Sequence, residues 1–144
     1  MDYKQKEIIT GILIGLVISL LFAVKVVAAP ITPEEKELLV RTVQAEAGNQ
    51  DLNGRRLVVS VVLNRVESPL FPDTVKGVLS QEGQFVTYRK LGSARPTWKD
   101  ELAVQMEMEE RINRSVIFFS CGSYIPNTDG LMKYGDHYFS TLYE

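Results

Sequence analysis

Apolar and polar residues alternate over residues 32–48 with the spacing of an amphipathic helix. Leu39, Val43 and Glu46 are separated by four and three positions, so they share one face of such a helix. Thr32 is a typical N-cap, and Gly48 is a typical residue for the C-terminal end. The pattern therefore predicts a helix whose buried face carries a single acid, Glu46.

Three further stretches have helical patterns. Residues 55–66 are apolar on all sides, and their length favours a buried helix over a strand. Asp73 is expected to cap a short helix through residues 75–79, and residues 98–113 form a third candidate. Along that third helix we expect a core face, composed of Trp98, Leu102, Met106 and Ile112.

The C-terminal part has the pattern of strands. Residues 115–120 and 134–140 are rich in β-branched and aromatic side chains. The segments 83–95 and 122–135 are expected to be loops. Helices that precede a small antiparallel strand pair predict a mainly helical α+β domain.

The first 30 residues form a separate segment. Lys4 and Lys6 precede an uncharged run over residues 8–24, which ends at Lys25. This arrangement fits a signal peptide cleaved after Ala28, and it equally fits a signal-anchor that holds the protein in the membrane. In both cases we expect residues 31–144 to be exported as one catalytic domain, outside the cytoplasm.

Charge and composition limit the partners and cofactors. The chain has 16 Lys and Arg against 18 Asp and Glu, a formal net charge of −2, which argues against a nucleic-acid partner. Its single cysteine, Cys121, cannot form an internal disulfide, and we expect it to be buried and inert. With only one histidine, His137, the chain has too few ligands for a zinc peptidase or amidase. We therefore expect neither a metal nor a cofactor.

Glu46 is the first candidate for catalysis. The other acids of the helix, Glu34, Glu35 and Glu37, lie in its first turn, where they stabilise the helix dipole. An acid on the buried face lacks that explanation. Burial favours the protonated form of a carboxyl group, which a general acid requires. The alternative is a glutamate at the domain edge that reaches water or pairs with Arg55.

Five short blocks carry a resemblance to a known family. They read Val-Gln-Ala-Glu-Ala-Gly at residues 43–48, Asn-Arg at 64–65, Ser-Pro-Leu-Phe-Pro at 68–72, Gln-Phe at 84–85 and Gly-Asp-His-Tyr-Phe at 135–139. In this order they resemble the SleB-type cell-wall hydrolases, also called spore-cortex-lytic enzymes, which have relatives in phages. The resemblance covers nearly all of the predicted exported domain.

The resemblance implies a lysozyme-like domain that cuts the glycan strand of peptidoglycan. Such a lytic transglycosylase cleaves the β-1,4 bond from N-acetylmuramic acid to N-acetylglucosamine and leaves 1,6-anhydromuramic ends. The residue that matches its single acid and base is Glu46. The chain departs from the family at Asn49, where many relatives have an acid. It also has Asp136 where the closing Gly-Asn-His motif has an amide.

The same resemblance suggests residues that bind the glycan. Gln84 and Phe85 match the family's Gln-Phe, and they could hydrogen-bond an N-acetyl group and stack on a sugar face. His137 comes from the closing motif. Tyr88 and Tyr124 are candidates because they lie in predicted loops.

Three alternative functions stay open. The first is a hydrolytic muramidase with a second carboxylate, drawn from the acids of loops or element edges: Asp51, Glu82, Asp129 and Asp136. The others are an amidase acting on the peptide stem and a glycan-binding module without catalysis. The sequence gives no expectation for the oligomeric state.

Overall fold

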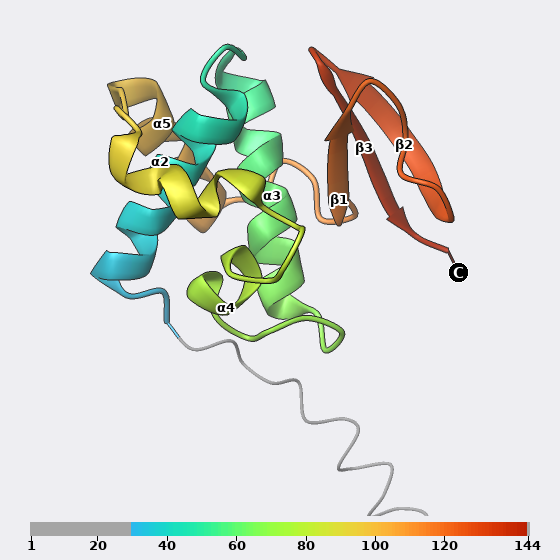
Figure 1. The fold of residues 1–144 in the computed structure, drawn as a ribbon, viewed down its shortest axis with the longest axis horizontal. Coiled ribbons are helices and arrows are strands. Elements are labelled where there is room, and N and C mark those ends of the chain that lie inside the picture. The colour runs from blue at the N-terminus through green and yellow to red at the C-terminus, as the bar shows by residue number, and fades with distance from the viewer. Residues whose placement is uncertain (1–29, 144) are drawn as a thin grey trace, which may run out of the picture.

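The computed structural model describes residues 30–143, which fold into a group of helices and a small sheet (Figure 1). The predicted export segment lies, up to residue 29, outside the described residues. Among the helices of the described part, none is long and apolar enough to cross a membrane.

Helix α2 (Pro33–Ala47) confirms the first predicted helix. Thr32 and Glu35 form a reciprocal capping box, with Glu35 N donating to Thr32 Oγ1 at 3.2 Å. Leu39, Val43 and Ala47 are buried, as the amphipathic spacing predicts.

Helix α3 (Leu52–Glu67) also confirms its prediction, but it begins three residues earlier than expected. Asp51 caps it, because its carboxylate accepts a hydrogen bond from Gly54 N at 2.9 Å. The helix passes through the middle of the domain, with other elements on several sides, so its residues from Leu57 to Val66 are all buried.

Two short helices follow: the first confirms its prediction except for the cap, and the second was not predicted. Helix α4 (Val75–Leu79) is capped by Thr74, not by Asp73, since Gly77 N donates to Thr74 Oγ1 at 3.0 Å. The predicted loop 83–95 contains a 3₁₀-helix, η1 (Val86–Ser93). A 3₁₀-helix of this length has no apolar repeat by which a sequence could reveal it.

Helix α5 (Trp98–Glu109) ends before the predicted residue 113, and its expected core face is wrong. Trp98 is 66% exposed and Ile112 is 38% exposed. The buried face consists instead of Asp100, Ala103, Val104 and Glu107. These two acids can be buried because each pairs with an arginine of α3, Asp100 with Arg55 and Glu107 with Arg56.

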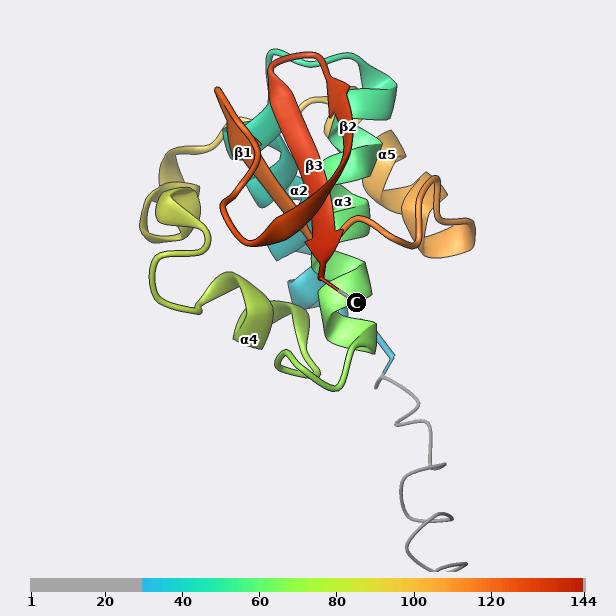
Figure 2. The same ribbon diagram turned by 90° about the vertical axis from the view of Figure 1, so that its right-hand side faces the viewer.

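The sheet has three strands, not the predicted two: β1 (Phe118–Cys121), β2 (Thr128–Tyr134) and β3 (His137–Leu142). They are antiparallel in the order β1-β3-β2, with β3 in the centre (Figure 2). The segment 122–135 was expected to be a loop because β2 lacks a regular alternation of polar and apolar residues. Its pairing with β3 shifts register between Gly130 and Met132.

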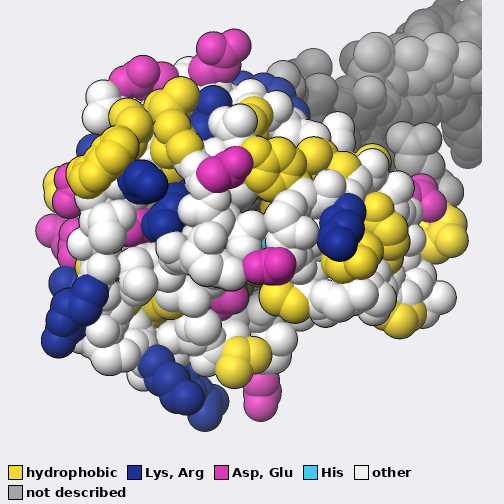
Figure 3. Space-filling model, turned by 90° about the horizontal axis from the view of Figure 1, so that it is seen from above, with side chains coloured by type: hydrophobic (Ala, Val, Ile, Leu, Met, Phe, Trp, Pro, Cys, Tyr) yellow, Lys and Arg dark blue, Asp and Glu magenta, His cyan; other side chains and the backbone are white. Residues whose placement is uncertain are grey.

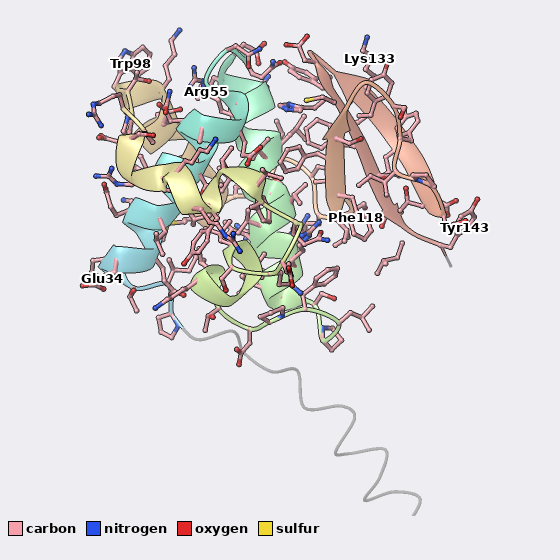
Figure 4. The ribbon with its side chains drawn as sticks, in the orientation of Figure 1. Glu34, Arg55, Trp98, Phe118, Lys133 and Tyr143 are labelled. Carbon is pink, nitrogen blue, oxygen red and sulfur yellow. The ribbon has the colours of Figure 1, made fainter. Side chains whose placement is uncertain are left out.

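Two groups of buried side chains lie on opposite sides of α3. The larger group joins α3 to the other helices and includes Leu39, Val62 and Leu79. The smaller joins α3 to the sheet and includes Val58 and Phe139. Figure 4 shows Phe118 among the side chains between the sheet and the helices.

Candidate active site

Glu46 lies in the last turn of α2 and is half-buried, less than its place on the predicted buried face implies. The hydroxyl of Thr87, in η1, is hydrogen-bonded to its Oε1 atom. His137 of β3 lies close enough for the Glu46 carboxylate to act on the pKa of its imidazole. The carboxylate is thus placed where α2, η1 and β3 come together.

His137 is 3% exposed and lies against two aromatic rings. Its ring makes edge-to-face contacts with Phe119 and Phe139, at centroid distances of 5.2 and 5.9 Å. Burial lowers the pKa of His137, while the charges of Glu46 and Asp136 and the Glu46 backbone act in the opposite direction. Its Nδ1 atom is buried without a hydrogen-bond partner among residues 30–143. Burial therefore outweighs the neighbouring charges, and the pKa of His137 lies below its ordinary value.

The turn between β2 and β3 is attached to the loop that follows α2. Asn49 Nδ2 and Gln50 Nε2 donate to Asp136 Oδ2, at 2.8 and 2.9 Å. Tyr134 Oη donates to Asp51 Oδ2 at 2.9 Å. These bonds fix the start of β3, and with it His137, relative to the end of α2.

Gln84 and Phe85 both contact Arg65 of α3. Gln84 is exposed and accepts a hydrogen bond from Arg65 Nη1 at 3.1 Å. Phe85 is 5% exposed, and its ring packs against Phe119 and the Arg65 guanidinium. A ring that stacks on sugar must be exposed, so this burial does not fit the role expected for Phe85.

Arg65 itself is a buried cation within an aromatic cluster. Its guanidinium lies over Phe71, Phe85 and Phe118, at 5.1 to 5.4 Å from the ring centroids. Its Nε donates to the backbone oxygen of Ile117 at 2.7 Å. Burial lowers the pKa of Arg65 to about 10.

Tyr88 directly follows Thr87 in η1. It lines a groove of about 610 Å³ together with residues of the first turns of α2, among them Pro33, Glu34 and Glu37. Glu46 is not among the residues that line this groove, and a role of Tyr88 in glycan binding stays a prediction.

Tyr124 packs against the sheet. Its ring is 39% exposed and packs edge-to-face on Tyr138 at 5.1 Å. Neighbouring residues of a strand point to opposite faces of the sheet, so Tyr138 and Tyr124 lie on the face away from His137.

Cys121 is exposed, which corrects the expectation of a buried thiol. It is the last residue of β1 and pairs with His137 in the register of the sheet. The strand ends here, so no further packing covers the side chain. Within residues 30–143, no group of three or more His, Cys, Asp or Glu could hold a metal ion.

Thr87 is the residue that sequence reasoning missed. It lies in the segment expected to be a loop, where no repeat marks which side chains face inward. The only available signal was its position two residues after the Gln-Phe block.

A family model described as Cell Wall Hydrolase matches residues 49–140, a stretch that includes Thr87 and His137 but begins after Glu46. The spore cortex-lytic enzyme of Oceanobacillus iheyensis is 41% identical over 49 residues, which are 34% of this chain and 18% of that protein. The match thus spans about a fifth of the length of that relative.

Two solved structures have a similar fold. One is the catalytic domain of the Bacillus cereus SleB protein, with a TM-score of 0.68 and 22% identity over 77% of this chain and 92% of that one. The other is the catalytic domain of the germination-specific lytic transglycosylase SleB from Bacillus anthracis. It has a TM-score of 0.68 and 21% identity, and the match covers 80% of this chain and all of that one.

Proposed function

The chain belongs to the cell wall hydrolase family, and we propose on this basis that residues 31–144 cut the glycan strand of peptidoglycan outside the cytoplasm. The likeness to a catalytic domain whose title names a lytic transglycosylase supports this class of reaction. The acidic net charge agrees with a partner that is not a nucleic acid. Figure 3 shows acidic and basic side chains interspersed with hydrophobic ones on the face seen from above.

In the proposed reaction, Glu46 gives its proton to the oxygen between N-acetylmuramic acid and N-acetylglucosamine. The bond to this oxygen breaks through an oxocarbenium-like state, and N-acetylglucosamine leaves with the proton. The ionised Glu46 then takes the proton from the C6 hydroxyl of the muramic acid. The freed oxygen closes a 1,6-anhydro ring, so the reaction needs neither water nor a second carboxylate.

The observation that carries this proposal is the setting of one carboxylate. Glu46 is half-buried, its Oε1 is hydrogen-bonded to Thr87, and burial lowers the pKa of the neighbouring His137. The other acids at this end of the domain have different partners, Asp51 in the cap of α3 and Asp136 in the turn. One carboxylate that acts as acid and then as base fits this arrangement.

A hydrolytic muramidase is the second candidate, and Asp136 is the observation that favours it. Two amides hold this carboxylate in place, and its charge acts on His137, which adjoins Glu46. Inverting glycosidases separate their two carboxyl groups by about 6.5–9.5 Å, and retaining ones by about 5–5.5 Å. Under this alternative, Asp136 would activate water or act as the nucleophile.

The proposed setting follows from the family and from the predicted export segment. Peptidoglycan lies outside the cytoplasmic membrane, so the enzyme must act there. Whether the segment is cleaved or anchors the protein decides only whether the domain works free or at the membrane. An amidase or a glycan-binding module would not need the setting of Glu46 described above.

The test is mass spectrometry of peptidoglycan fragments released by the full chain in mild detergent. We compare the wild type with Glu46→Gln, and with Glu34→Gln as a control acid on the same helix. Anhydromuramic ends from the wild type and the control, but not from Glu46→Gln, support the proposal. Reducing muramic ends would establish a hydrolase instead, and Asp136→Asn would then be tested as the second carboxylate.

A further inference from the structure

We infer that Thr87 is a positioning residue that holds Glu46 through its Oε1 atom and leaves Oε2 to meet the substrate. The inference rests on the proposed function and assigns a role that neither the sequence motifs nor the family match assigns. Its starting point is the hydrogen bond between the Thr87 hydroxyl and Glu46 Oε1, across 41 positions of sequence.

The position of Thr87 is fixed by the two ends of η1. At the first end, Phe85 is buried against Phe119, and its backbone oxygen accepts from Tyr88 N at 3.0 Å. At the other end, Leu91 is 5% exposed, and its backbone oxygen accepts from Arg41 Nη1 of α2 at 3.4 Å. The hydroxyl is therefore presented by an element anchored on both sides, and partly on α2 itself.

A hydroxyl suits a carboxyl group that loses and regains a proton. Threonine has one donor and two acceptor lone pairs. It donates to Oε1 when the carboxylate is ionised, and it still donates to Oε1 when the acid carries its transferable proton on Oε2, because Oε1 is then a carbonyl oxygen. The same contact therefore fixes the side chain in both halves of the proposed cycle, without a change in position.

The effect on the reaction follows from these two roles. A hydrogen bond to an ionised group contributes more than one between neutral groups. Without the Thr87 hydroxyl, the ionised Glu46 left after the first proton transfer is less stabilised, and its side chain can adopt other rotamers. Both changes slow the chemical steps without removing a contact to the glycan, so kcat should fall while KM stays the same.

The experiment measures kcat and KM of the full chain, in detergent, on soluble uncross-linked glycan strands. Thr87→Val removes the hydroxyl at nearly constant shape, and Thr87→Ser keeps it. For Thr87→Val we expect kcat to fall by roughly 10- to 100-fold, the range for a lost hydrogen bond to a charged group, with KM within about twofold. Thr87→Ser should retain most of the activity.

A pH–rate profile separates positioning from a general loss of structure. The alkaline limb of kcat/KM reports deprotonation of the essential acid in the free enzyme. Loss of a donor to the ionised form disfavours that form, so this limb should move to higher pH in Thr87→Val and stay in place in Thr87→Ser. Ser93→Ala is the matched control, because it removes a hydroxyl at the other end of η1 that bonds only Lys90 O at 2.8 Å.

Each outcome has one meaning. If Glu46→Gln is inactive and Thr87→Val retains the wild-type kcat and profile, the positioning role is wrong and the proposed function stands. If Glu46→Gln keeps full activity, the proposed function itself fails. Should Thr87→Val not fold by circular dichroism, Thr87→Ala replaces it. The role is equally wrong if Thr87→Ser loses as much activity as the variant without the hydroxyl.

Discussion

Glu46 differs from the other acids of α2 in what surrounds its carboxylate. Glu35 belongs to the capping box, and Glu37 pairs with Arg41 on the surface at 2.8 Å. Glu35 also accepts a hydrogen bond from Lys76 N of α4 at 3.4 Å. Glu46 instead lies between η1 and β3, where groups from distant parts of the chain decide its environment.

We predict that His137 makes the stability of the domain depend on pH. Its pKa is lowered in the folded state, chiefly by burial, so the unfolded chain binds a proton more readily. The stability that comes from keeping His137 neutral is fully present above the ordinary pKa of about 6.5. It is lost as the pH falls from there towards the pKa in the folded state. The free energy of unfolding should therefore decrease between about pH 7.5 and pH 5.

Urea denaturation at several pH values would measure this effect. His137→Gln cannot take up the proton, so its stability should vary less over the same range than that of the wild type. Equal slopes for both proteins would show that His137 is not the group responsible.

The site could be predicted from the sequence only in part. Helical spacing identified Glu46, because an acid on an apolar face stands out against its neighbours. Thr87 could not be identified in this way, since no periodic pattern marks η1. The burial of Phe85 was equally hidden, because it depends on Arg65 and Phe119, which are distant in sequence.

The two positions where this chain differs from the family pattern meet at the turn between β2 and β3. The chain has an amide at Asn49 where many relatives have an acid, and an acid at Asp136 where the motif has an amide. These two residues are hydrogen-bonded to each other at 2.8 Å.

Among the elements, α5 is the one whose sequence pattern misleads. A search for apolar side chains selects Trp98 and Ile112, which are exposed, and passes over Asp100 and Glu107, which are fully buried. Arg55 and Arg56, on α3, compensate the buried charges. Figure 4 shows Arg55 near the start of α3 and Trp98 at the periphery of the helices. The family and the helical class, by contrast, were predicted correctly from local signals.

We predict that Glu107→Ala lowers the free energy of unfolding by about 3–5 kcal/mol, the usual cost of breaking a buried ion pair. The carboxylate of Glu107 accepts from Arg56 Nε at 2.8 Å, from Ser60 Oγ and from Ile112 N at 3.0 Å. Its removal leaves all three donors without this partner.

The measurement is urea denaturation at neutral pH, with Glu109→Ala as the control on the exposed side of the same helix. An exposed substitution of this kind should change the stability by no more than about 0.5 kcal/mol. A similar small change for both variants would mean that α5 does not depend on its buried acids.

For the molecule as a whole, the junction between the helices and the sheet determines how the two parts are oriented. Side chains of α3 pack against Phe139 along the middle of this junction. At the end nearest Glu46, hydrogen bonds replace this apolar packing. They join Asn49, Gln50 and Asp51 to the turn between β2 and β3. The sheet therefore covers the helices with a defined orientation (Figure 2).

We predict that this junction is most sensitive to substitution at Gly135. Its φ of +55° is unfavourable for other residues, and a Cβ atom there would lie 1.8 Å from Gln50 Oε1. We expect Gly135→Ala to lower the free energy of unfolding by more than about 1 kcal/mol. Release of fragments from peptidoglycan should also slow, because Asp136 and His137 follow directly.

Gly92→Ala provides the comparison, since nothing lies within 4 Å of a Cβ atom at that position. Both variants would be followed by urea denaturation and by the fragment assay. The prediction fails if Gly135→Ala is as stable and as active as Gly92→Ala.

The strand order has a consequence for how the protein folds during its synthesis. β3 is the last of the three strands along the chain, yet it is the central one, to which both β1 and β2 pair. During synthesis, Glu46 and Thr87 leave the ribosome well before His137 does. The sheet cannot form until that final strand is free, and pairings between distant segments form slowly. An incomplete chain therefore holds the acid without its surroundings, and activity arises only when the whole domain has folded.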